Sequence, residues 1–134
     1  MATSIGLSNS VTKELILASV AKDSQQAFYQ ADIGTECGLY LQFVKSEFLT
    51  PGSEGVFTCG LNSEGESVVL NIEEKDPVNK IYDITPRNVP SGPCFNIHMD
   101  GTNPSPDTLI ESSGYNQCDS SVPNRVERVL DVYY

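Results

Sequence analysis

Four cysteines, at positions 37, 59, 94 and 118, constrain the fold of this chain more than any other feature. They are even in number and widely spaced, and none belongs to a Cys-x-x-Cys pair, so the spacing favours two disulfides over a zinc site. Sequential pairing, Cys37 with Cys59 and Cys94 with Cys118, would stabilise the fold by about 3 kcal/mol per loop. Nested pairing, Cys37 with Cys118 and Cys59 with Cys94, and four reduced thiols are the alternatives. We favour the sequential form, which predicts a secreted, extracellular protein.

Short runs of alternating apolar residues dominate the rest of the chain. Residues 67–73 place Val68, Leu70 and Ile72 on one face, and residues 94–99 do the same with Phe95, Ile97 and Met99. Such period-two alternation is typical of half-buried β-strands. Further strands are expected at residues 27–31, 38–44 (with Leu39, Leu41 and Phe43 on one face), 55–59, 80–84, 109–110 and 126–134. Residues 14–21 suit a buried strand, although their propensity also suits a helix.

Turn residues separate these runs along the whole chain. Turns are expected at residues 50–53 and 62–65, where Gly65 can take a positive φ, and Asp76-Pro77 ends a strand. Prolines recur between residues 86 and 93, where a central strand is excluded. We therefore predict one all-β domain over residues 1–134, with a loosely ordered segment at residues 1–12. Its architecture would be a β-barrel or sandwich of about eight or nine short, mostly antiparallel strands with two disulfides.

The charge of the chain excludes some partners. Net charge is −10 and the sequence pI is about 4.3, with the eight Lys and Arg residues scattered. Such a surface repels phosphate backbones, so no nucleic-acid partner is expected. The apolar stretches are far shorter than the ~20 residues of a membrane-spanning helix, so no membrane insertion is expected either. The oligomeric state does not follow from the sequence.

Side chains that could carry chemistry form no convincing constellation. His98 is the sole histidine and stands near Asp100, but it alternates with apolar neighbours and no G-x-S-x-G motif accompanies it. Acidic pairs such as Glu73-Glu74 are expected by chance among 18 carboxylates and suit solvated turns. Residues 100–107 lack the ligand ladder of a calcium loop. We predict no catalytic residue, no cofactor and no metal site.

Residues 57–63, Phe-Thr-Cys-Gly-Leu-Asn-Ser, resemble a Cys-Gly-x-Asn-Ser turn of the major mould-allergen family of secreted fungal β-barrels. Cys94, the Pro-rich loop and Cys118 before a terminal strand are similar to that family's second disulfide loop. The size and acidity of the chain also resemble those of secreted elicitors of plant defence, such as the hypersensitive-response-inducing elicitors of the rice blast fungus. The resemblance implies a secreted, non-enzymatic elicitor or effector that a plant surface or apoplastic protein or glycan recognises.

Two other functions stay open. One is a small secreted hydrolase that acts on cell-wall polysaccharide through paired carboxylates. The other is a lectin-like or inhibitory binding module that uses the loop around residues 91–106. The candidate binding residues in and beside that loop are Ser91, His98, Asp100 and Asn103.

Overall fold

The chain begins with one long helix. The computed structural model describes residues 2–49, 55–61, 65–87, 91–104 and 107–134; side chains are described from Lys13 onward, apart from those of residues 47 and 48. Helix α1 runs over Ala2–Phe43, which at 1.5 Å per residue makes it roughly 60 Å long. A single 3-10 turn, η1, follows at Ser46–Leu49. The predicted turn at residues 50–53 lies outside the described residues.

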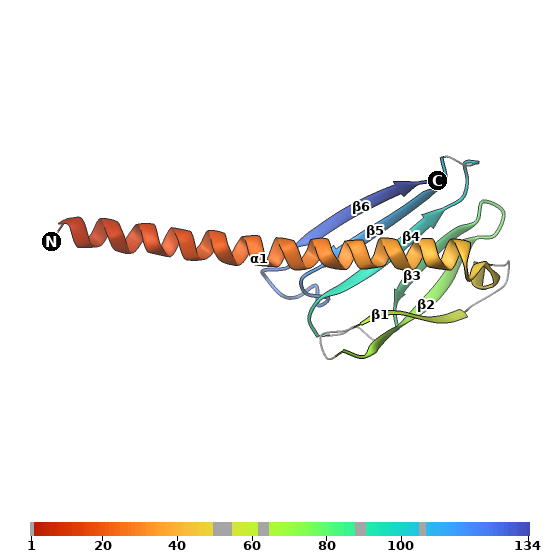
Figure 1. Cartoon of the computed structure of the whole chain (residues 1–134), viewed down its shortest axis with the longest axis horizontal. Coiled ribbons are helices and arrows are strands. Elements are labelled where there is room, and N and C mark those ends of the chain that lie inside the picture. Colours follow the sequence, from red (N-terminus) through yellow and green to blue (C-terminus); the bar gives the residue numbers. More distant parts are fainter. Residues whose placement is uncertain (1, 50–54, 62–64, 88–90, 105–106) are drawn as a thin grey trace.

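The rest of the described chain forms one antiparallel sheet. Its strands are β1 (Gly55–Leu61), β2 (Ser67–Asp76), β3 (Ile81–Pro86), β4 (Cys94–Asp100), β5 (Leu109–Tyr115) and β6 (Glu127–Tyr133). Each strand pairs with the next in sequence, so the sheet is a simple meander from β1 to β6. Figure 1 shows the second half of α1 lying across one face of this sheet, while its first half projects clear of it.

The predicted barrel or sandwich of eight or nine strands is wrong. The described chain holds six strands in an open sheet, whose edges are β1 and β6, and a long helix covers one face. The six downstream runs of alternation did predict strands correctly. The error comes from residues 27–31 and 38–44, which the alternation assigned to strands, and from residues 14–21, which suited a buried strand although their propensity also suited a helix. All of these residues except Val44 belong to α1. The fold is therefore mostly β with one helix, rather than all-β.

A stripe of small residues explains why residues 27–41 are helical. Ala27, Ala31, Gly34, Gly38 and Leu41 recur at spacings of four and three, which places them on one face of a helix, and all five are buried. Because four of them are Ala or Gly, the stripe adds little hydrophobicity to the sequence pattern. The more conspicuous Leu39, Leu41 and Phe43 of the predicted strand do not share a face.

Close approach of the helix to β5 requires those small residues. A Cβ on Gly114 of β5 would collide with the backbone of Ala27 and Ala31, and a Cβ on Gly34 would collide with the Ser112 hydroxyl. The two backbones thus touch where side chains are absent. The helix also covers β4 and β6, so its second half is bound to the sheet along its length.

The core fills the space between the helix and the sheet. Its buried members include Leu41 of α1 and, from the sheet, Phe57, Leu70, Ile72, Tyr82, Ile84, Phe95, Ile97, Met99 and Ile110. The predicted inward set Phe95, Ile97 and Met99 is confirmed at 2% exposure each, and Leu70 and Ile72 are buried as well. Gly65 has φ of +79°, as its turn predicted, although residues 62–64 of that turn lie outside the described residues.

Two disulfides close the fold. Cys37 of α1 is joined to Cys59 of β1, and Cys94 of β4 is joined to Cys118 in the segment between β5 and β6. This is the sequential pairing that the spacing favoured. The first bond fastens the helix to the edge strand β1, where few other helix contacts occur. The single domain over residues 1–134 and the loosely ordered segment at residues 1–12 stay predictions.

Candidate functional site

The projecting part of α1 is the most unusual surface of the molecule. We call residues 2–23 the stalk and residues 24–134 the sheet domain. The boundary lies where Arg128 of β6 donates a hydrogen bond from Nε to the Ser24 hydroxyl, at 3.0 Å, and Ala27 is the first fully buried helix residue. From Lys13 to Lys22 every stalk side chain is exposed. No part of the described sheet therefore covers this stretch.

Four large apolar side chains lie on this uncovered stretch. Leu15, Ile16, Leu17 and Val20 are 67%, 58%, 69% and 55% exposed. Successive helix residues point about 100° apart, so Leu15, Ile16 and Leu17 together face more than half of the helix circumference. Leu17 and Val20 also continue the face that carries Ala27 and Ala31 onto the sheet. A helix that is apolar on several sides is normally buried among neighbours.

Sequence reasoning missed this surface because it favoured a buried strand for residues 14–21, although their propensity also suited a helix. These residues are apolar, as the sequence shows, but the burial that was inferred from their apolar character is wrong. A signal was present in the flanking residues: Lys13-Glu14 and Lys22-Asp23 enclose the apolar stretch with charges of both signs. Such flanks are unusual for a buried strand and suit an exposed helix.

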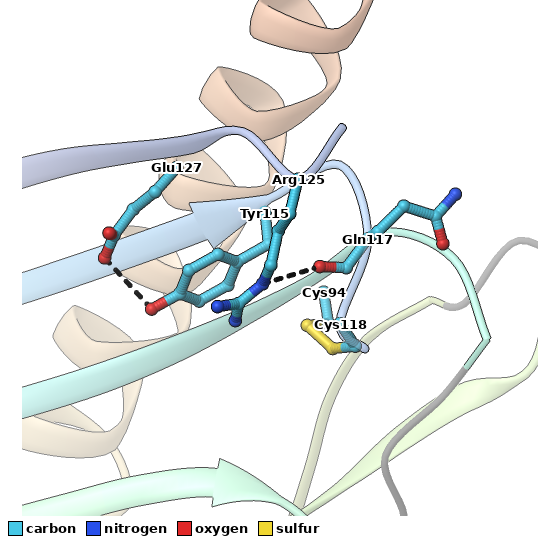
Figure 2. The surroundings of a disulfide bond; sticks show 6 residues. All are labelled: Cys94, Tyr115, Gln117, Cys118, Arg125 and Glu127. Atoms are coloured by element: carbon cyan, nitrogen blue, oxygen red, sulfur yellow. Dashed lines mark hydrogen bonds between the residues drawn. A yellow bond between two sulfur atoms is a disulfide. The ribbon is translucent and has the colours of Figure 1, made fainter. Parts of the chain in front are cut away.

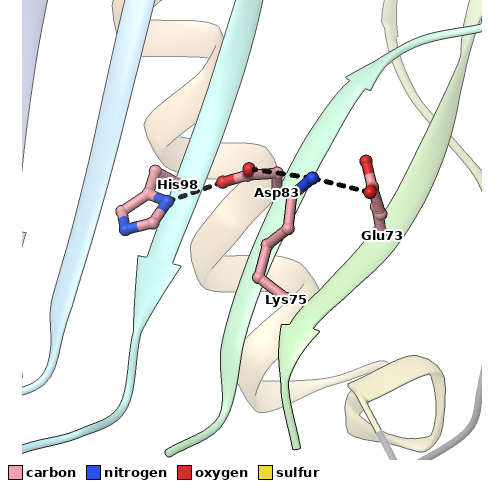
Figure 3. Close-up of polar contacts among 4 residues, drawn as sticks. All are labelled: Glu73, Lys75, Asp83 and His98. Atoms are coloured by element: carbon pink, nitrogen blue, oxygen red, sulfur yellow. Dashed lines mark hydrogen bonds and ion pairs between the residues drawn. The ribbon is translucent and has the colours of Figure 1, made fainter.

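The outer face of the sheet, opposite α1, carries a row of ionisable side chains. Cross-strand pairing aligns Glu73, Asp83, His98, Glu111 and Asp131 on five successive strands. A lysine of β2, Lys75, joins the row: its Nζ lies 2.6 Å from Glu73 Oε1 and 3.8 Å from Asp83 Oδ2 (Figure 3). The hydrogen bond to Glu73 raises the pKa of Lys75 above its usual value. The row is partly exposed and gives this face an acidic character.

His98 pairs with Asp83 and not with Asp100, its predicted neighbour. His98 Nδ1 lies 2.6 Å from Asp83 Oδ1 across β3 and β4. Asp100 instead accepts a hydrogen bond from the Thr102 amide, and its pKa is lowered by its hydrogen bonds to the Thr102 side chain and amide. The partner was missed because sequence distance does not reveal cross-strand register. A histidine and a carboxylate alone lack the nucleophile or substrate cleft that catalysis needs.

A second cluster surrounds the Cys94–Cys118 disulfide. The Arg125 guanidinium lies 3.9 Å from the centre of the Tyr115 ring, and its Nε donates to the Gln117 carbonyl at 3.0 Å (Figure 2). The Tyr115 hydroxyl donates to Glu127 Oε1 at 3.0 Å. Burial, followed by the bond to Glu127, raises the pKa of Tyr115. The Tyr115 hydroxyl, the Arg125 Nε and the Gln117 carbonyl thus all have intramolecular partners, so the cluster fastens the β5–β6 connection.

The four candidate binding residues do not converge. Ser91 is exposed before the start of β4, whereas Asp100 ends that strand and Asn103 lies beyond it. A seven-residue strand separates Ser91 from Asp100, which is roughly 20 Å. His98 points to the outer face between them. The structure therefore groups Asp100 with Asn103 near one end of the sheet and leaves Ser91 at the other.

The described residues offer neither a cluster of metal ligands nor a helix that could span a membrane. That part of the chain contains no group of three or more His, Cys, Asp or Glu side chains arranged to hold a metal ion. None of its helices is long and apolar enough to cross a membrane. Comparison with known proteins found no matching family model, no matching curated protein and no matching solved structure.

Proposed function

We propose that this chain is a structural subunit that assembles with copies of itself through the stalk and displays its acidic sheet domain on the outside. The observation that carries the proposal is the exposure of Leu15, Ile16, Leu17 and Val20 on a helix that no described part of the chain covers. Burying those four side chains would contribute about 1.5–3 kcal/mol each. Exposed apolar surfaces of this kind mark sites of interaction with other molecules.

Copies of the same chain fit the stalk better than a charged partner. Residues 1–23 contain two lysines and two acidic residues, so the stalk is neutral, and the whole net charge of −10 resides in the sheet domain. The charges of the stalk are self-complementary, since Lys13 and Lys22 on one copy can pair with Glu14 and Asp23 on another. The acidic sheet domains repel one another and would stay apart on the outside of the assembly.

More than two helices are expected to meet in such an assembly. A two-helix seam covers one narrow stripe of each helix. Leu15, Ile16 and Leu17 face three directions, so one neighbour leaves at least one of them in water. A bundle or filament in which each stalk has several neighbours covers all three. Head-to-tail contacts between identical subunits would extend such a bundle without closing it.

The two disulfides support an extracellular location for this protein. Disulfides persist in oxidising compartments and are rare in the cytosol. A structural subunit outside the cell also needs no catalytic centre. Among the described residues, three carboxyl groups, those of Asp76, Asp100 and Asp119, have a pKa that their hydrogen bonds lower. The general acid of a carboxylate-pair hydrolase needs a raised pKa, so these three carboxyl groups do not suit that role.

Sedimentation of the purified chain tests the proposal. The wild-type protein should sediment as an oligomer well above 14.6 kDa, and the triple variant Leu15→Ser, Ile16→Ser, Leu17→Ser as a monomer. Val78→Ser is the control, because Val78, at 85% exposure, is an even more exposed apolar residue in a turn of the sheet domain. Val78→Ser should assemble like the wild type. A wild-type protein that stays monomeric at every accessible concentration would refute the proposal.

Elicitor activity stays a separate proposal that derives from the resemblance at residues 57–63. It is compatible with a structural subunit, because a plant receptor could recognise the sheet domain whether or not the stalks assemble. Oxidised protein infiltrated into leaves should cause local cell death, reduction should abolish the response, and substitution of His98 should not. Absence of any response to correctly oxidised protein would end this proposal without affecting the one on assembly.

A further inference from the structure

A pocket of about 400 Å³ lies at the end of the molecule remote from the N-terminus of the stalk. It is enclosed by the C-terminal end of α1, by η1, and by the turns that join β2 to β3 and β4 to β5. Its size is within the range of small-molecule sites. In an assembly built on the stalk, this end of the sheet domain would stay accessible. The inference therefore goes beyond the assembly function and does not depend on it.

The pocket combines an apolar floor with a polar rim. Tyr82 and Met99 form the floor at 2% exposure each, and the half-buried ring of Tyr134 lies beside them. The Tyr82 hydroxyl is fixed by its bond to the Leu49 carbonyl, at 2.6 Å. Burial raises the pKa of both Tyr82 and Tyr134. The floor is thus a rigid surface with two aromatic rings.

Four side chains with hydrogen-bonding groups surround that floor: Gln42, Ser46, Lys80 and Asn103. Among the residues that the structure describes, none of the four side chains bonds to another residue of the chain. Nearby polar side chains behave differently, since Asp76, Asp100 and Thr108 all have intramolecular partners. Donors that converge on one pocket without internal partners are what a ligand site requires.

Lys80 is held in the rim by a constrained turn. Its φ is +54°, a left-handed conformation that costs a non-glycine residue about 1–2 kcal/mol. Asp76 fixes the turn by accepting hydrogen bonds from the Val78 amide at 2.9 Å and from the Asn79 side chain at 2.7 Å. The Lys80 carbonyl accepts a bond from the Gly101 amide at 3.2 Å. Glycine would fit this position without strain, yet a lysine occupies it.

We infer that the pocket binds a single sugar that carries one carboxylate, a uronic acid. The amides of Gln42 and Asn103 can each donate and accept, as sugar hydroxyls require. The ammonium of Lys80 matches a single carboxylate, and the half-buried ring of Tyr134 can pack against the C–H face of a sugar. A ligand with several negative charges is disfavoured by the net charge of −10. This assigns a sugar ligand to Asn103 and Lys80 rather than to the whole of residues 91–106.

Titration with glucuronic acid, followed by nitrogen–proton NMR of the full chain, tests the inference. We expect a Kd of about 1 mM, typical of a single sugar contact, with shifted side-chain amide signals of Gln42 and Asn103. Lys80→Gln should weaken glucuronic acid binding about fivefold, the scale of one exposed ion pair, and leave glucose binding unchanged. The matched control is Lys75→Gln on the outer face, which should change neither.

Three results would overturn the inference. The first is an absence of shifts at Gln42 and Asn103 with glucuronic acid. The second is an equal response to acetate, which would show a site for any anion. The third is unchanged affinity in Lys80→Gln. Lys80→Gly guards against a folding artefact, because it relieves the strained φ and should weaken glucuronic acid binding to the same extent in a protein at least as stable as the wild type.

Discussion

The two halves of α1 have the same secondary structure and opposite surroundings. From Ser24 to Phe43 the helix presents Ala27, Ala31, Gly34 and Gly38 to the sheet, so closely that backbones touch. From Lys13 to Lys22 it presents Leu, Ile and Val to solvent. The half with the weaker hydrophobicity is thus the buried half. The buried half of α1 is the half whose small side chains fit closely against the sheet. The large apolar side chains of the stalk have no such surface to pack on and remain exposed.

The two halves of α1 also differ in what stabilises their helical conformation. Isolated helices are marginal in water at lengths of about 12–15 residues, and most helices in proteins are stabilised by tertiary packing. The packed half has the sheet and the Cys37–Cys59 bond. The stalk has neither, so its helical state in solution depends on neighbours. Substitutions in the sheet domain should therefore affect stability more than substitutions in the stalk.

Gly114→Ala should have the largest effect on the packed half. The added methyl would collide with the backbone of Ala27 and Ala31, which cannot move aside as a flexible side chain can. We expect a loss of about 3–4 kcal/mol in the free energy of unfolding, measured by urea denaturation. Ser19→Ala, which introduces an alanine in the exposed stalk by removing a hydroxyl, should change that free energy by less than about 0.5 kcal/mol. Equal effects at the two positions would show that the close contact with β5 is absent.

Loss of the Cys37–Cys59 disulfide should have the next largest effect. The bond closes a loop with a sequence separation of 22 residues, and the loop entropy corresponds to about 3 kcal/mol. The double variant Cys37→Ala, Cys59→Ala should therefore unfold at lower urea concentration. The stalk assembly should survive wherever the sheet domain remains folded. A variant as stable as the oxidised wild type would contradict the role assigned to this bond.

Acid should weaken the sheet domain by a smaller amount. The pKa of Asp76 is lowered from its ordinary value of 3.8, first by the hydrogen bond from the Asn79 amide, and that of Asp119 by its bonds to Ser121. A lowered folded pKa means that the stability is present above the unfolded pKa and is lost as pH falls through the folded one. Urea midpoints should thus fall below about pH 3.8. Asp76→Asn should show a shallower dependence, and an unchanged slope would remove Asp76 as a contributor.

Substitutions in the stalk should have the smallest effect on the sheet domain. The triple variant Leu15→Ser, Ile16→Ser, Leu17→Ser removes no contact with the described sheet, so its unfolding free energy as a monomer should stay within about 0.5 kcal/mol of the wild type. Circular dichroism should nevertheless show less helix, because the stalk has lost its neighbours. A large loss of sheet-domain stability would mean that the stalk packs on the sheet in solution.

The sequence predicted the sheet far better than the helix. Alternation identifies half-buried strands because one face meets the core, as with Phe95, Ile97 and Met99. The helix was hidden because its buried stripe is Ala and Gly, which no count of large apolar residues detects. The open topology was also beyond prediction, since six strands in sequence order are compatible with a barrel, a sandwich or a meander.

The candidate surfaces were predicted less well than the fold. Asn103 lines a pocket, but the other polar residues of that pocket, Lys80, Gln42 and Ser46, come from three other segments that only the folded chain brings together. The partner of His98 depends on the register of β3 with β4, which local sequence does not contain. The stalk was missed for another reason. Apolar residues in a sequence predict burial within the chain. The apolar residues of the stalk are instead exposed on the single chain, and in our proposal they become buried only when copies assemble.

Hydrogen–deuterium exchange, followed across a range of protein concentrations, tests the central claim most directly. In dilute solution the amides from Lys13 to Lys22 should exchange rapidly, while those from Ala27 to Leu41 stay protected by the sheet. At high concentration the protection of the stalk should rise as copies assemble, and the protection of the packed half should not change. Stalk protection that is independent of protein concentration would contradict the account.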